Sequence, residues 1–198
     1  QAIIAEEGSA MGPLLRFVHR IAEDINADYP DVYVDTLAYQ YSVKPCKITK
    51  PADNVIIRYC TGICCAHGVS GQNKKCANKE AVANIRNWSR EKSKLYIWDY
   101  TVNFANYLTP YPNIHAVAES IKFYATKEVS GVFMQGMYQD GESGEFGERR
   151  AYVMSKVMWD PSLDVEELIS DFMAAYYGAA AEQMTDYLDS LSAALKKT

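Results

Sequence analysis

The strongest constraint on the fold is the alternation of short apolar runs with longer segments of helical periodicity. Four runs rich in β-branched and aromatic residues are expected as strands: Val32–Tyr39, Val55–Cys60, Lys94–Tyr100 and Gly131–Gly136. Segments with apolar residues at helical spacing precede or separate them: Leu14–Ala27, Lys79–Ser93 and Ile114–Lys127. Strands that alternate with helices predict βαβ units and a parallel sheet, and therefore an α/β fold.

Two segments depart from this alternation. The connection from Ser42 to Asp53 carries Pro45 and Pro51, so we expect an irregular crossover there and not a helix. Residues 1–12 (QAIIAEEGSAMG) are expected to form a loop or a frayed end. Gln1 is not a natural translation start, which predicts either a removed leader or a cut from a larger protein.

Two or three helices are predicted after the fourth strand. They cover roughly Glu145–Met158, Val165–Tyr176 and Ala180–Lys196. Asp164 is a plausible N-cap for the second of these, because Glu167 follows it at the spacing of a capping box. The sheet-forming part is thus expected within residues 1–150 and the trailing helices within 151–198.

Length and charge narrow the class of protein. The chain has 198 residues, whereas a complete (β/α)8 barrel takes about 250. Its net charge of −5 argues against nucleic-acid binding, which usually uses a basic surface. No apolar run approaches the ~18 residues that a membrane-spanning helix needs. No P-loop or G-x-S-x-G motif occurs, and we expect no cofactor.

Polar and aromatic side chains collect where the predicted strands end. In parallel α/β folds, ligands bind at the carboxyl ends of the strands. Rings stack on sugar faces, and amides and carboxylates hold hydroxyl groups, so this set suits a carbohydrate ligand. The expected substrate-binding residues are Tyr39, Tyr41, Tyr100, Asn103, Gln135, Tyr138 and Glu142.

Asp99 and Glu145 are the expected catalytic pair, with Glu142 in reserve. Glycoside hydrolysis normally uses two carboxyl groups, separated by about 5 Å or by about 6.5–9.5 Å. Each residue also has a structural interpretation. Asp99 would fix a loop by hydrogen bonding. Glu145 would be a first-turn residue that the helix dipole stabilises. The tyrosines, 15 in the chain, would equally fill a core.

The five cysteines do not follow a standard zinc pattern. Cys60, Cys64, Cys65 and Cys76 surround His67, and Cys46 lies upstream. Disulfides in an exported protein, free thiols, a metal site and a catalytic cysteine–histidine pair all remain open. The number is odd, so at least one thiol lacks an intrachain partner.

Several strings, in this order and spacing, resemble one family. They are Leu37–Tyr41 (LAYQY), Tyr96–Phe104 (YIWDYTVNF), Tyr111–Asn113 (YPN), Gly131–Gly136 (GVFMQG), Gly144–Phe146 (GEF), Met158–Pro161 (MWDP) and Tyr176–Gly178 (YYG). The chain resembles the DUF4838 family of bacterial proteins, which is related to barrel glycoside hydrolases. The segment Val157–Phe172 is also similar to the helix pair that follows the barrel in microbial α-glucuronidases.

The resemblance implies the C-terminal half of a (β/α)8 barrel, with four parallel strands and trailing helices. It also implies carbohydrate processing, a glycan partner and an exported location. A half barrel leaves sheet edges and apolar helix faces uncovered, so we expect a missing N-terminal half or self-association. Three functions stay open: a glycoside-hydrolase-like enzyme, a non-catalytic carbohydrate-binding module, or a fragment that is inactive alone.

Overall fold

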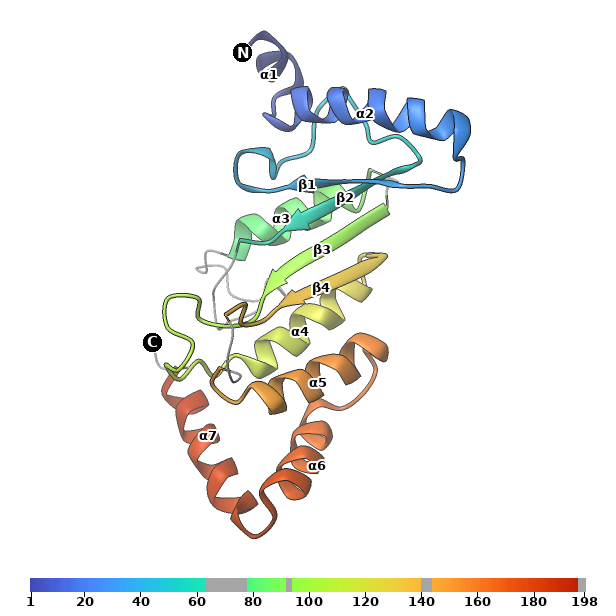
Figure 1. Cartoon of the computed structure of the whole chain (residues 1–198). Coiled ribbons are helices and arrows are strands. Elements are labelled where there is room, and N and C mark those ends of the chain that lie inside the picture. Colours follow the sequence, from blue (N-terminus) through green and yellow to red (C-terminus); the bar gives the residue numbers. More distant parts are fainter. Residues whose placement is uncertain (63–77, 92–93, 140–143, 196–198) are drawn as a thin grey trace. The chain divides into compact units, whose positions relative to one another are not determined.

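The computed structural model describes residues 1–62, 78–91, 94–139 and 144–195, and it contains one parallel sheet. Its strands follow the order β1-β2-β3-β4, with helices between and after them (Figure 1). Their bounds are Val34–Ala38 for β1, Val55–Cys60 for β2, Lys94–Tyr100 for β3 and Gly131–Gln135 for β4. The α/β class is confirmed, and the arrangement is consistent with half of a (β/α)8 barrel.

The pairing and burial of the strands explain why their sequence patterns predicted them. Val34 pairs with Val55, and Ile56 pairs with Lys94, so β1, β2 and β3 end at one edge of the sheet. Strand β2 is buried along almost its whole length, as its continuous apolar run predicts. Strand β3 alternates instead, with Leu95, Ile97 and Asp99 on its buried side.

The helices that begin after residue 10 agree with the predicted periodic segments. Their bounds are α1 Ala2–Glu7, α2 Met11–Asp28, α3 Asn78–Trp88, α4 Ile114–Ala125, α5 Gly147–Trp159, α6 Val165–Tyr177 and α7 Ala181–Leu195. Short 3-10 turns span Gln40–Ser42 (η1) and Gly178–Ala180 (η2). The β1–β2 connection contains only η1, which confirms the irregular crossover. Asp164 caps α6 by accepting hydrogen bonds from the backbone amides of Glu166 and Glu167, as predicted.

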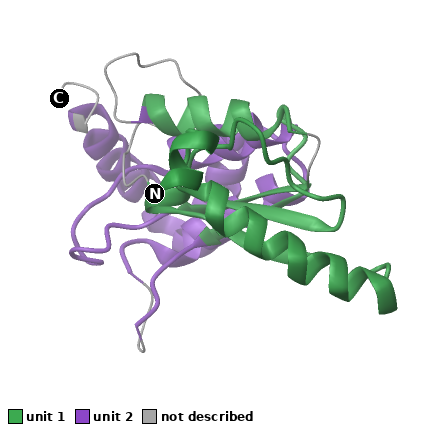
Figure 2. Ribbon diagram, turned by 90° about the horizontal axis from the view of Figure 1, so that it is seen from above, with its two compact units in different colours: residues 1–63, 79–100, 126–134 green, residues 64–78, 101–125, 135–198 purple. Residues whose placement is uncertain are grey.

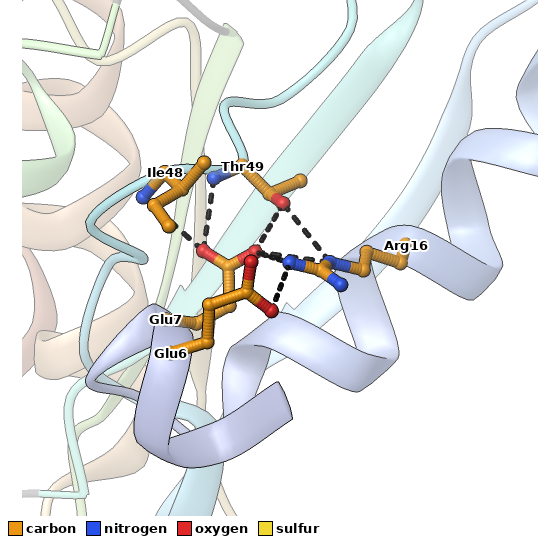
Figure 3. Close-up of polar contacts among 5 residues, drawn as sticks. All are labelled: Glu6, Glu7, Arg16, Ile48 and Thr49. Carbon is orange, nitrogen blue, oxygen red and sulfur yellow. Dashed lines mark hydrogen bonds and ion pairs between the residues drawn. The ribbon is translucent and has the colours of Figure 1, made fainter. Parts of the chain in front are cut away.

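The expectation for residues 1–12 was wrong. This segment forms α1 and the start of α2, and Glu7 is fully buried. The Glu7 carboxylate accepts hydrogen bonds from the backbone amides of Ile48 and Thr49 (Figure 3). A Cβ on Gly12 would lie 2.5 Å from Glu7 Cγ, so the first turn of α2 needs glycine there. Long-range contacts therefore order a segment whose local pattern is weak.

The chain divides into two compact units (Figure 2). Unit 1 comprises residues 1–63, 79–100 and 126–134, and unit 2 comprises residues 64–78, 101–125 and 135–198. In unit 1 the core includes Leu15 and Ile57. In unit 2, α4 contacts α5, α5 contacts α6 and α6 contacts α7, around a core that includes Tyr124 and Val153. The boundary near residue 150 stays a prediction.

Candidate functional site

In unit 1, two of the predicted tyrosines present their rings to solvent just after β1. Tyr39 is 38% exposed and Tyr41, within η1, is 72% exposed. The backbone there is fixed by Ser42, whose hydroxyl accepts a hydrogen bond from the Tyr39 amide and donates one to the Tyr39 carbonyl. Tyr100, at the end of β3, is half-buried. Two exposed rings on a fixed turn can contact a ligand without reordering the chain.

Asp99 is buried, and its carboxylate is engaged inside unit 1. Its Oδ1 accepts a hydrogen bond of 2.6 Å from Thr61 Oγ1 and one of 2.9 Å from the Tyr100 amide. Only 6% of Asp99 is exposed. These contacts join the end of β3 to the residue after β2. They match the loop-fixing interpretation of Asp99 more closely than that of an open catalytic carboxylate.

In unit 2, three rings meet on the loops that follow β3 and β4. Phe104 stacks on Tyr138 with ring centroids 6.4 Å apart, and Tyr107 meets both rings edge to face at 5.8 and 5.9 Å. We call Phe104, Tyr107 and Tyr138 the aromatic cluster. Tyr138 is 69% exposed, while burial and the neighbouring Tyr138 raise the pKa of Tyr107. The cluster thus offers one open ring, that of Tyr138, against two half-buried rings.

Glu145 lies beside this cluster and pairs with a buried arginine. Its backbone amide donates to the Tyr107 carbonyl at 2.9 Å, and Arg150 Nη2 donates to its Oε2 at 2.9 Å. The two side chains are only 9% and 6% exposed. In the described part of the chain, Glu145 Oε1 is buried and has no hydrogen-bond partner. A buried acceptor of this kind is costly unless a ligand or water supplies a donor.

Further hydrogen bonds hold Arg150 and the strand ends in unit 2. Arg150 Nη1 donates to Asn113 Oδ1, and Asn113 Nδ2 donates to the Thr101 carbonyl at 3.1 Å. The amide and hydroxyl of Thr101 both donate to the Gln135 carbonyl, at 3.0 and 2.9 Å. Asn103 accepts from the Ala105 amide in a tight turn. The network fixes the loops that carry the aromatic cluster and Glu145.

Two guanidiniums at neighbouring positions are buried, and one of them, that of Arg150, is paired with Glu145. Arg149 and Arg150 are 7% and 5% exposed. Burial lowers the pKa of each, and the Glu145 charge acts in the opposite direction. Sequence reasoning missed both residues. Their place in the first turn of α5, where the helix dipole disfavours basic side chains, was the available signal.

The structure brings together only part of the predicted site. Asn103, Gln135, Tyr138 and Glu145 belong to unit 2. The other described candidates, Tyr39, Tyr41, Asp99 and Tyr100, belong to unit 1. The predicted catalytic pair is therefore divided between the units. Glu142 lies outside the described residues.

The thiols and acidic groups give no metal centre in the described ranges. Cys46 and Cys60 are buried free thiols, and burial raises the pKa of each to about 11. High thiol pKa values make both poor nucleophiles at neutral pH. Cys64, Cys65, His67 and Cys76 lie outside the described residues. Among those described, no three histidine, cysteine or acidic residues are grouped to hold a metal ion.

Fold and site together define an α/β protein with one parallel sheet and with polar and aromatic residues on the loops after its strands. The chain belongs to the DUF4838 family, described as a domain of unknown function, whose family model matches residues 1–189. No curated protein and no solved structure gives a significant match. None of the described helices has the length and apolar character to cross a membrane.

Proposed function

We propose that this domain serves carbohydrate processing and that it binds a glycan at the aromatic cluster of unit 2. The observation that carries the proposal is the open Tyr138 ring, stacked on Phe104 and continuous through Tyr107 with Glu145. A sugar ring can stack on an exposed aromatic face. Its hydroxyl groups can then donate to Glu145 Oε1, the buried oxygen that lacks a donor among the described residues.

The finer proposal is a glycoside-hydrolase-like activity in which Glu145 contacts the sugar. Arg150 holds Oε2, so the free Oε1 has a fixed direction. A fixed carboxylate beside a ring-binding surface suits hydrolysis, which depends on positioning as much as on acid–base chemistry. Asp99 belongs to unit 1 and stays a sequence-based candidate for the second carboxyl group.

One observation favours a second candidate, a non-catalytic carbohydrate-binding module. The Asp99 carboxylate is buried and bonded to Thr61 and to its own strand end. If Asp99 only fixes that loop, the predicted pair loses one member, and binding remains without turnover.

Binding is tested by affinity electrophoresis of the full chain against soluble xylan, polygalacturonate, alginate and β-glucan. We expect retardation by at least one polysaccharide, and Tyr138→Ala should weaken it about tenfold through loss of stacking. Tyr29→Ala is the matched control, because Tyr29 is 63% exposed at the end of α2. Retardation that is equal in both variants, or absent throughout, would reject the aromatic cluster as the glycan site.

Turnover separates the two candidates. Reducing-end release from a retained polysaccharide is measured for the wild type, Glu145→Gln and Asp99→Asn. The enzyme proposal expects loss of release of at least about 100-fold in each variant while binding persists. Glu119→Gln, an exposed change on α4, should keep wild-type rates. Binding without any release by the wild type would support the binding module.

A further inference from the structure

Unit 2 contains a pocket that lies apart from the residues of the aromatic cluster. It has a volume of about 360 Å³ and lies among the start of α4, α5, α6 and α7. Its apolar floor includes Ile169, Met173 and Leu188, all buried. Its lining residues do not include Phe104, Tyr138 or the other residues of the proposed glycan site. Its volume lies within the range that small-molecule sites occupy.

Arg149 lines this pocket and carries a charge that the described residues leave poorly compensated. Only 7% of Arg149 is exposed, and its Nε has no hydrogen-bond partner in the described chain. Its close contact is the Phe146 ring, 5.5 Å from the guanidinium carbon. Glu145 attracts it at longer range but is already paired with Arg150. Burying such a cation is costly unless an anion joins it.

The wall of the pocket made by α7 is acidic. Glu182, Asp186 and Asp189 follow one another at helical spacing along α7, and all three line the pocket and are exposed. His115 and Glu166 form a separate pair at 3.3 Å on the wall made by α4 and α6. The pocket therefore offers a buried cation at one point and several hydrogen-bond acceptors at another.

This distribution selects one kind of ligand. A guanidinium binds a carboxylate with two parallel hydrogen bonds. The carboxylates of α7 accept hydrogen bonds from hydroxyl or ammonium groups, and they repel a second negative charge. We propose that the pocket binds a small molecule that places one carboxylate on Arg149 and directs hydrogen-bond donors toward the acidic face of α7.

The competing arrangement is internal. Asp189 also attracts Arg149 electrostatically, and a rotated Asp189 side chain would neutralise it without a ligand. In that case the pocket would bind none of the probes, and Asp189→Asn would destabilise the protein. The ligand proposal expects Asp189→Asn to change binding while the melting temperature stays near that of the wild type.

The full chain is titrated with four probes. Binding is measured by calorimetry and by the shifts of the amide NMR signals. Glucuronate carries a carboxylate and hydroxyls, lysine carries a carboxylate and ammonium groups, glucose lacks the carboxylate, and inorganic phosphate lacks the separate donors. We expect glucuronate or lysine to bind at least tenfold more tightly than glucose or phosphate. Arg149→Gln should remove this preference, and Arg20→Gln, an exposed change on α2, should keep it.

A variant set on α7 keeps the test decisive if Arg149→Gln fails to fold. Glu182→Gln and Asp186→Asn change exposed side chains and should weaken the carboxylate probe severalfold. If these variants lose more affinity for lysine than for glucuronate, ammonium is the donor. If they lose more affinity for glucuronate, the hydroxyl groups are the donors. Tyr138→Ala should leave this binding unchanged, which separates it from the glycan site. Equal binding of glucose, tighter binding of phosphate, or no binding of any probe would overturn the proposal.

Discussion

Two buried charged side chains, one in each unit, differ in how far the protein satisfies their hydrogen-bonding groups. Glu7 in unit 1 accepts hydrogen bonds from two backbone amides, the Thr49 hydroxyl and Arg16, and these contacts lower its pKa from 4.5 to about 2 (Figure 3). Arg149 in unit 2 is almost as deeply buried, but its Nε lacks a partner in the described chain, and burial lowers its pKa.

The difference teaches how to separate structural from functional buried charges. A charge whose hydrogen-bonding capacity is filled by the protein stabilises the fold, and its removal leaves several donors unsatisfied. A charge whose capacity stays open lowers stability, and a pocket beside it suggests that a ligand completes it. Removal of Glu7 and of Arg149 should therefore change stability in opposite directions.

The largest expected effect follows loss of the Glu7 charge. Glu7→Gln keeps the shape but weakens the ion pair with Arg16 and mismatches the amide donors. We expect the melting temperature, followed by circular dichroism, to fall by roughly 10 °C. Glu6→Gln is the control, because the Glu6 side chain is half exposed and accepts its hydrogen bond from Arg16 Nη2, a nitrogen that also donates to Glu7. Similar shifts in both variants would show that burial of Glu7 is unimportant.

A smaller effect is expected at Gly12. A Cβ placed there meets Glu7 Cγ at 2.5 Å and Cβ at 2.7 Å, so the saturated carboxylate would have to move. Gly12→Ala should lower the free energy of unfolding in urea by about 1–3 kcal/mol. Gly136→Ala provides the comparison, since nothing lies within 4 Å of a Cβ built there. A neutral Gly12→Ala would mean that Glu7 is free to shift.

Acid provides a graded test of the same contact. The folded-state pKa of Glu7 is depressed from 4.5 to about 2, so its stabilising contribution is complete above about pH 4.5. It declines as the pH falls toward 2, where the folded state also becomes protonated. The difference in melting temperature between wild type and Glu7→Gln should therefore shrink between pH 5 and pH 2. A difference that stays constant over this range would contradict the assignment.

Much of the fold was predictable because its signals are local. The bounds of β2 and β3 were predicted to the residue, since a continuous apolar run and a strict alternation mark them. Asp164 was recognisable from the capping pattern. The helix at Ala2–Glu7 was missed because Glu7 is held by Thr49, a residue distant in the sequence.

The sequence predicts that the candidate residues follow strands but not which contacts they make, and their role in a site stays a prediction. Tyr138 and Glu145 follow β4, where the rule for parallel sheets places ligand contacts. The engagement of Asp99 by Thr61 depends on which strands are neighbours, so composition could not reveal it. The burial of Arg149 and Arg150 likewise depends on how the helices of unit 2 pack, which helical periodicity alone does not specify.

The most direct test compares the unfolding free energies of Arg149→Met and Glu7→Gln in urea, without added ligand. Methionine keeps much of the volume of Arg149 and removes a buried charge with an open Nε. We expect the unfolding free energy of Arg149→Met to be about 1 kcal/mol higher than that of the wild type. The unfolding free energy of Glu7→Gln should be lower than that of the wild type. A loss of stability in Arg149→Met as large as that in Glu7→Gln would contradict the distinction between a filled and an open buried charge.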